Sequence, residues 1–245
     1  KHEPSTTVNA STKSEVLITT GELELYDEFS PSDFNDDFRV LNSSGPSNDV
    51  EFAPLIRAAI EPLYVASFNT DFETIIWQGN TGGAEPVKRF NGLLVTGDAD
   101  GTLNSVTPAG AITSANVIAI FGALTAALPA VVKGKTQPFI VCNHVDYFLY
   151  HEALRALDSK GVNLDVGGFT TFSGYRLVPV SGMPAGRLWM THNQNIKLGG
   201  WAQSDLSNVL VARTAAMNRT WGIKITAEWG VNFVVGAEIA DYITA

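Results

Sequence analysis

The chain has 245 residues, 45% of them apolar and 17% charged, which is typical of a folded protein with one large domain or two small ones. Its 16 basic and 25 acidic residues give a formal net charge of −9, which argues against a dedicated nucleic-acid-binding protein, since such proteins need clustered Lys and Arg. A single cysteine, Cys142, excludes an intrachain disulfide framework and a zinc site with several cysteines. The longest apolar stretch, residues 117–132, is too short and too rich in alanine to predict a membrane span.

The acidic residues are concentrated near the N-terminus. Ten lie between Glu15 and Glu51, opposed there only by Arg39, and the rest of the chain carries 15 acidic and 15 basic residues. Two interpretations stay open: a solvated loop kept soluble by its charge, or an arm that docks on a basic surface of another subunit. Because the chain begins with Lys1 rather than Met, we expect a processed product or the ordered part of a longer protein.

The first fifth of the chain has too few apolar residues to form a hydrophobic core of its own. Residues 1–14 are polar and predict a flexible arm. Residues 16–25 alternate in part between apolar and polar side chains, which predicts one strand, or two short ones around Gly21. The residues that follow are mainly polar and end in a loop at 42–48. Residues 16–49 are therefore predicted to form a long, extended and acidic excursion.

A helix is predicted next. Asp49 can cap it, Pro54 lies in its first turns, and Pro62 should kink it. One face of this helix is apolar, made of Phe52, Leu55, Ile56, Ala59, Leu63 and Tyr64. Residues 72–77 are predicted as the helix end or a strand. Three connections are predicted to follow, at residues 79–83, 89–94 and 97–101.

The second half alternates helices with strands. Ser114 is predicted to cap a buried helix that Pro129 ends, and a buried strand at 138–142 leads into a helix capped by Asn143 that runs to about Ser159. Two hairpins and one helix complete the prediction: strands 175–180 and 187–191, a helix at 205–217, and strands 223–227 and 231–235 turning at Trp229-Gly230. Helices mixed with antiparallel hairpins indicate the α+β class.

No catalytic or metal-binding signature is present in the sequence. The richest polar cluster, residues 142–146 followed by His151-Glu152, lacks zinc-ligand spacing, because His144 and His151 are two helical turns apart. Asp98-Ala99-Asp100-Gly101 lacks the flanking ligands of a calcium loop. A small Cys-dependent hydrolase stays open as an alternative and would require Cys142 to be exposed near a His. We therefore expect no catalytic residues, no metal and no cofactor.

Several segments resemble the major capsid proteins of tailed double-stranded DNA bacteriophages. The first is Pro138-Phe139-Ile140-Val141 followed by His144-Val145-Asp146-Tyr147, a strand leading into a helix. The next are residues 174–187, similar to that family's Gly-Met-Pro hairpin, residues 195–200, and the closing segment 230–242. Upstream, residues 75–80 and 89–93 resemble capsid proteins of phages that infect Bacteroidetes-type hosts, including crAss-like phages. The order of these segments along the chain carries the resemblance.

The resemblance implies the Hong Kong 97-type capsid fold and its parts. Residues 1–15 would be the N-terminal arm and residues 16–49 the E-loop. Residues 50–91 with 206–245 would form the peripheral domain with the spine helix, and residues 92–205 the axial domain. The E-loop would reach over a neighbouring subunit. The candidate contact residues are Glu24, Phe29, Phe34, Asp36, Asp37, Phe38, Arg39 and Leu41.

The function implied is that of a structural protein rather than an enzyme. Subunits would self-assemble as hexamers and pentamers into an icosahedral virion capsid around the phage DNA, which they would enclose without sequence-specific binding. Assembly would take place in the host bacterial cytoplasm with a portal, a scaffold or maturation protease, and possible decoration proteins, and without a membrane. An encapsulin, a cellular nanocompartment shell with the same fold, is the alternative.

Overall fold

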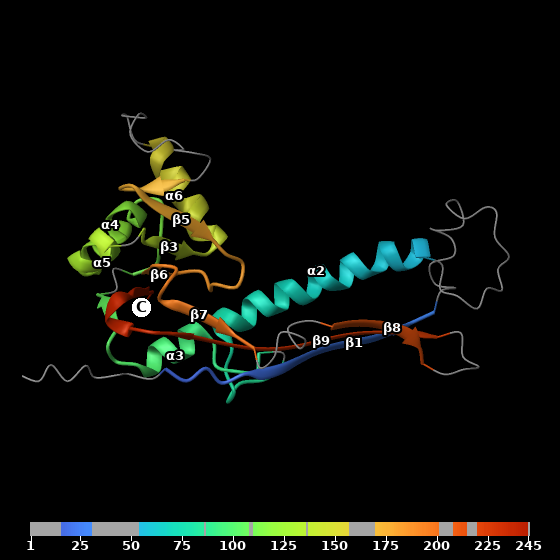
Figure 1. Ribbon diagram of the computed structural model, residues 1–245. Coiled ribbons are helices and arrows are strands. Elements are labelled where there is room, and N and C mark those ends of the chain that lie inside the picture. The colour runs from blue at the N-terminus through green and yellow to red at the C-terminus, as the bar shows by residue number, and fades with distance from the viewer. Residues whose placement is uncertain are drawn as a thin grey trace, which may run out of the picture.

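The computed structural model describes residues 16–30, 54–85, 87–107, 110–135, 137–156, 170–200, 208–214 and 220–244. The molecule has two parts, which lie at an angle to one another (Figure 1). The lobe contains a six-stranded sheet and most of the helices. The extension consists of a long helix, α2 (Pro54–Gln78), beside the strands β1 (Gly21–Phe29), β8 (Asn208–Arg213) and β9 (Trp221–Phe233). Within the described residues no helix has the length and apolar character needed to cross a membrane.

The extension is organised around β9, which is 13 residues long. All nine residues of β1 pair antiparallel with β9, from Gly21 opposite Trp229 to Phe29 opposite Trp221. On the other edge of β9 lie β8 and the short β7 (Ile196–Gly199), both antiparallel. Apart from Asp27, the sheet side chains of β1 and β9 that face α2 are apolar, which is the period-2 pattern of a strand with one covered face.

Two sequence predictions are wrong in this sheet. The predicted helix at 205–217 is instead β8 at 208–213, where Val209 and Val211 alternate with Leu210 and Ala212. The predicted hairpin turn at Trp229-Gly230 is part of the unbroken strand β9. Gly230 has a different role there, because a Cβ atom at this position would lie 2.4 Å from the carbonyl oxygen of Thr19. The glycine permits a close approach of two backbones rather than a turn.

α2 runs for 25 residues and includes residues 72–77, one of the two alternatives predicted for them. Pro62 lies inside the helix without ending it. Ile60 and Tyr64 pack toward the sheet, but Leu63, predicted on the same apolar face, is 70% exposed. The described part of the helix therefore buries a narrower face than its sequence predicts.

The lobe sheet has the strand order β2-β10-β6-β3-β5-β4. Its strands are β2 (Asn104–Val106), β3 (Phe139–Cys142), β4 (Thr171–Phe172), β5 (Tyr175–Pro179), β6 (Arg187–Thr191) and β10 (Ala240–Ile243). The predicted hairpin of residues 175–180 and 187–191 is wrong, because β3 lies between these strands, parallel to β5 and antiparallel to β6. Pairing across 35 or more residues cannot be read from local sequence pattern.

The lobe helices match the predictions in part. They are α3 (Leu93–Ala99), α4 (Val117–Ala127), α5 (Ala130–Lys135) and α6 (His144–Ala156), with the 3-10 turn η3 (Gly236–Glu238) before β10. Asn143 caps α6 as predicted, since its Oδ1 accepts the N–H of Val145 at 2.9 Å. Asn116 rather than Ser114 precedes α4. α3 occupies most of the predicted loop at 97–101.

Three apolar cores hold these parts together. The lobe core lies between α4, α6 and the six-stranded sheet and includes Phe121, Tyr150 and Tyr242. The junction core includes Trp77 of α2, Trp189 of β6 and Phe233 of β9, so it joins the extension to the lobe. A small tip core of Phe29, Ile60 and Ile223 ties β1, α2 and β9 together farther out. Burial of this kind contributes roughly 25 cal/mol per Å² of apolar surface.

Candidate contact surface

The extension presents an acidic face to solvent on the side opposite α2. Glu22, Glu24 and Glu28 of β1 are exposed there, because alternate residues of a strand share one face. Glu228 of β9 lies directly opposite Glu22, a like-charge pair that is unfavourable in a sheet. Lys224 offsets part of this charge, since its Nζ lies 3.0 Å from Glu24 Oε2. This face therefore keeps an excess of negative charge, which can interact with solvent or with a neighbouring surface.

The two candidate contact residues that lie in the described part have partners within their own chain. Glu24 forms the exposed ion pair with Lys224. Phe29 is only 7% exposed and packs in the tip core against Ile60 and Ile223, so a second subunit could cover little more of its surface. The remaining candidates lie outside the described residues, namely Phe34, Asp36, Asp37, Phe38, Arg39 and Leu41.

A side-chain hydrogen bond links β1 to α2. Tyr64 of α2 donates its hydroxyl hydrogen to Asp27 Oδ2 of β1 at 2.5 Å. Burial, followed by this contact with Asp27, raises the pKa of Tyr64 to about 12, so the phenol stays protonated and remains a donor across the physiological range. This hydrogen bond adds to the nine-residue pairing with β9 and to the tip core in positioning β1 and its acidic face.

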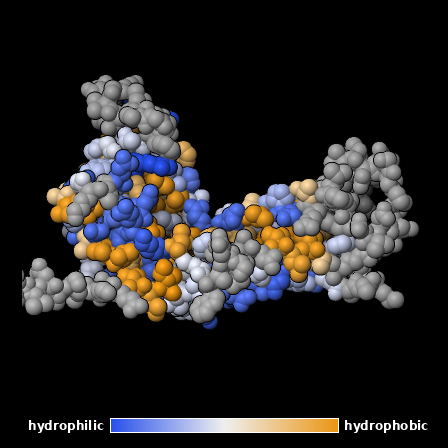
Figure 2. All heavy atoms as spheres, viewed as in Figure 1, coloured by the Kyte–Doolittle hydropathy of each residue, from blue (hydrophilic) through white to orange (hydrophobic). Residues whose placement is uncertain are grey.

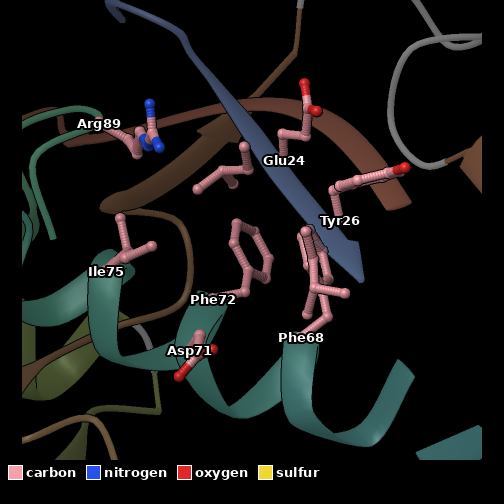
Figure 3. Close-up of a pocket in the computed structure, with 9 residues that line it drawn as sticks. Glu24, Tyr26, Phe68, Asp71, Phe72, Ile75 and Arg89 are labelled. Carbon is pink, nitrogen blue, oxygen red and sulfur yellow. The ribbon is translucent and has the colours of Figure 1, made fainter. Parts of the chain in front are cut away.

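A groove lies between β1 and α2, with a cavity volume of about 290 Å³ (Figure 3). Phe68, Phe72 and Ile75 of α2 form its apolar wall, and Phe72 reaches toward β1. Its polar rim includes Asp71 and Arg89, and Arg89 is itself paired with Glu85 at 3.3 Å. The residues that line the groove come mainly from β1 and α2, and their contacts hold these two elements of the extension together. The lining residues include no cluster of catalytic groups.

Apolar side chains are also exposed on both parts of the molecule, as Figure 2 shows for one face. On the extension these are Leu63, Tyr26 and Leu210, each more than half exposed. On the lobe, Val145 and Phe148 of α6 are 55% and 63% exposed. Val145 and Phe148 lie three residues apart on one face of α6, so they form a small exposed apolar area, whereas singly exposed apolar side chains are common on protein surfaces.

The polar cluster at residues 142–146 forms no catalytic site in the structure. Cys142 is fully buried in the lobe core, and burial, followed by the nearby Asp146 carboxylate, raises the pKa of its thiol to about 12. Asp146 accepts the backbone N–H of Gly186 at 2.9 Å and so has a structural role. The hydrolase alternative required an exposed Cys142, and the structure contradicts it. In the described ranges, no three His, Cys, Asp or Glu side chains gather closely enough to hold a metal ion.

A buried charge cluster in the lobe was not predicted. Arg187 of β6 donates to both carboxylate oxygens of Asp98, at 3.1 and 2.6 Å, and to Asp241 Oδ2 at 3.2 Å. Arg187 and Asp241 are 9% and 3% exposed. Burial raises the pKa of Asp241, and the Arg187 guanidinium partly offsets this. Partners 54 and 89 residues away from Arg187 leave no signal in a single sequence.

The reactivity of Cys142 provides a direct check of the lobe core. We expect the folded protein to resist a thiol reagent at pH 8, and unfolding to expose one thiol per chain, because a buried thiol with a pKa of about 12 has almost no accessible thiolate. Cys142→Ser should still fold but lose about 1–3 kcal/mol of stability, because it buries a hydroxyl in the lobe core. Rapid stoichiometric labelling of the native protein would contradict this placement of Cys142.

The fold is shared with shell proteins of known structure. The chain aligns over 100% of its length with 87% of a chain of the satellite phage P4 procapsid, at 10% identity and a TM-score of 0.57. It aligns over 99% of its length with 82% of a capsid chain of a native GTA particle, at 15% identity and a TM-score of 0.58. It also aligns over 93% of its length with 74% of a chain of the holo-SrpI encapsulin complex from Synechococcus elongatus, at 15% identity and a TM-score of 0.51.

Sequence comparison alone finds none of these relationships: no protein-family model matches the chain, and no curated protein matches it significantly. The structural likeness nevertheless spans both the lobe and the extension, since it covers nearly the whole chain. At identities of 10–15% a likeness establishes a fold. The chain therefore has the α+β fold of the Hong Kong 97 type, as its sequence predicts.

Proposed function

We propose that the chain is the major capsid protein of a tailed double-stranded DNA phage. Subunits assemble as hexamers and pentamers into an icosahedral shell that encloses the genome. The near full-length likeness to capsid chains supports this proposal most strongly. The shape of the subunit also supports it, because a lobe with a long, thin extension leaves much surface for neighbouring subunits (Figure 1). The protein acts through assembly rather than catalysis.

The parts of the fold are assigned by this proposal. α2 is the spine helix, β1 is the first strand of the E-loop at residues 16–49, and the axial domain corresponds to the lobe at residues 92–205. Residues 1–15 form the N-terminal arm, and residues 50–91 with 206–245 the peripheral domain. Two strands depart from these bounds, since β7 pairs with β9 of the extension and β10 pairs with β6 of the lobe.

The acidic E-loop is the proposed contact arm between subunits. Its candidate residues with apolar side chains, Phe34, Phe38 and Leu41, would be buried against a neighbour, and Asp36, Asp37 and Arg39 would form the polar rim. Glu24 adds to the acidic face of β1. Obligate contacts of this kind bury more than about 2,000 Å². The excess negative charge on β1 and β9 supports docking on a surface of opposite charge.

The wider assembly follows from the same proposal. The shell contains packaged DNA without sequence-specific contacts, which is compatible with the net charge of −9, because a container needs no tight binding to its content. A portal, a scaffold or maturation protease, and decoration proteins are the expected partners, and assembly takes place in the cytoplasm of a host bacterium. The phage lineage with Bacteroidetes-type hosts stays a prediction from the sequence segments.

An encapsulin shell is the second candidate, favoured by the likeness to a chain of the holo-SrpI encapsulin complex. The content of particles purified from the native source distinguishes the two. For a capsid we expect DNA that resists added nuclease until the shell is disrupted. For an encapsulin we expect particles that hold a protein and no protected DNA. Nuclease-sensitive DNA on intact particles would count against a genome container.

A further inference from the structure

The loop between β5 and β6 is hydrogen-bonded to the rest of the lobe near its middle and at its end. We name residues 181–186 the junction loop. Near its middle, Asn143 Nδ2 donates to the carbonyl oxygen of Met183, and at its end the N–H of Gly186 donates to Asp146 Oδ2 at 2.9 Å. The backbone N–H of Thr244 donates to the Gly186 carbonyl at 3.1 Å. The loop is therefore fixed to the first turn of α6 and to the end of the chain.

The same loop is bonded to the last turns of α2. Glu73 Oε1 accepts the N–H of Ser181 at 3.0 Å, and Gln78 Nε2 donates to the Gly182 carbonyl at 2.7 Å. A Cβ atom on Gly182 would lie 2.4 Å from the backbone carbonyl oxygen of Glu73, so only glycine permits this approach. Met183 is fully buried in the junction core. Six residues thus contact both parts of the molecule at the point where they meet.

These contacts restrict orientation in a way that the junction core does not. The free energy of apolar burial is non-directional and depends mainly on the area removed from water. Hydrogen bonds depend on distance and angle, and the close approach at Gly182 allows one separation of α2 from the loop. The loop therefore adds a directional contact between α2 and the lobe, beside the hydrogen bonds of Asn195 to the backbone of Val234 and Val235 just beyond the end of β9.

We propose that the junction loop is a latch that holds the extension at a fixed angle to the lobe. Releasing it from α2 lets the two parts pivot about the junction core. The consequence for a shell rests on the proposed function: the latch angle sets the curvature at which subunits meet, and so the particle diameter.

The test measures the angle in the isolated subunit by a spin-label distance between the two parts. The labels are placed at Leu210→Cys on β8 and Phe148→Cys on α6, both at exposed positions, while the buried Cys142 stays unlabelled. Two variants open the latch: Gly182→Ala, and the double variant Glu73→Ala/Gln78→Ala. Their controls are Gly101→Ala, where a Cβ meets nothing within 4 Å, and Ser67→Ala/Asn69→Ala at exposed positions of the same helix.

For the parent and both controls we expect one narrow distance distribution, and for the latch variants a roughly twofold broader or shifted one. Equal distributions in all five proteins would overturn the latch. If Gly182→Ala does not fold, the double variant decides alone. Electron microscopy of the same variants tests the second step, with mixed particle diameters expected. If the latch variants show the broader distances but the parent protein forms no shells, the latch stands and the proposed function is overturned.

Discussion

Replacing Arg187 with methionine is expected to destabilise the chain by about 3–5 kcal/mol, the usual cost of removing one partner of a buried ion pair. Arg187 holds together α3, β6 and β10 through Asp98 and Asp241. Without the guanidinium, the Asp241 carboxylate is left at 3% exposure with no compensating charge. Chemical denaturation of the purified subunit measures the loss. An unchanged midpoint would contradict the buried charge cluster.

The pH dependence of this variant has a definite sign. Burial already raises the pKa of Asp241, and loss of Arg187 raises it further. A carboxyl group whose folded pKa is raised lowers stability in full above the folded pKa, and this penalty decreases as the pH falls below the folded pKa and is gone below the unfolded pKa. The deficit of Arg187→Met relative to the parent should therefore be smaller at pH 5 than at pH 7. Adding Asp241→Asn should restore part of the stability at pH 7.

Lys224→Ala is the matched control for Arg187→Met. Lys224 also forms an ion pair, with Glu24 at 3.0 Å, but both side chains are about 40% exposed. Exposed pairs contribute about 0–1 kcal/mol, so this variant should unfold close to the parent. A large loss from Lys224→Ala would mean that the acidic face of β1 requires its cation for folding.

The second large effect is expected on assembly. Changing Phe34, Phe38 and Leu41 together to serine should prevent closed shells while the subunit keeps its thermal midpoint, because the proposal places these side chains between subunits. Size-exclusion chromatography and electron microscopy measure assembly, and circular dichroism measures the midpoint. Closed shells in the triple variant would defeat the assignment of this segment as the contact arm.

Phe29→Ser provides the contrast. This side chain is buried in the tip core of its own chain, so its loss should lower the thermal midpoint of the subunit itself. Deleting the whole of residues 16–49 is a poorer test, because it would also remove β1 and with it Leu23 of the junction core. Point substitutions keep the folding and assembly effects apart.

The sequence predicts the lobe better than the extension. The strand at 138–142 and the helix capped by Asn143 are local features, and both occur as β3 and α6. The extension depends on pairings that no local pattern contains. Gly230 resembles a turn residue, although its role is to let residues 18 and 19 pass close to β9. The hairpin of residues 175–191 fails for the same reason, since β3 enters from elsewhere in the chain.

The candidate contact surface could be predicted only in outline. The concentration of acidic residues before residue 51 is visible in the sequence, but which of them share a face follows from the register of β1 with β9. The pairing of Glu24 with Lys224 and the burial of Phe29 depend on contacts across roughly 200 residues of chain. The junction loop appears in the sequence only as a Gly-Met-Pro segment between two strands.

Negative-stain electron microscopy of the native particles, together with their absorbance ratio at 260 and 280 nm, tests the proposed function most directly. The proposal predicts closed angular shells of uniform size with the absorbance of nucleic acid. Monodisperse monomers or small oligomers, with the absorbance of protein alone, would contradict it.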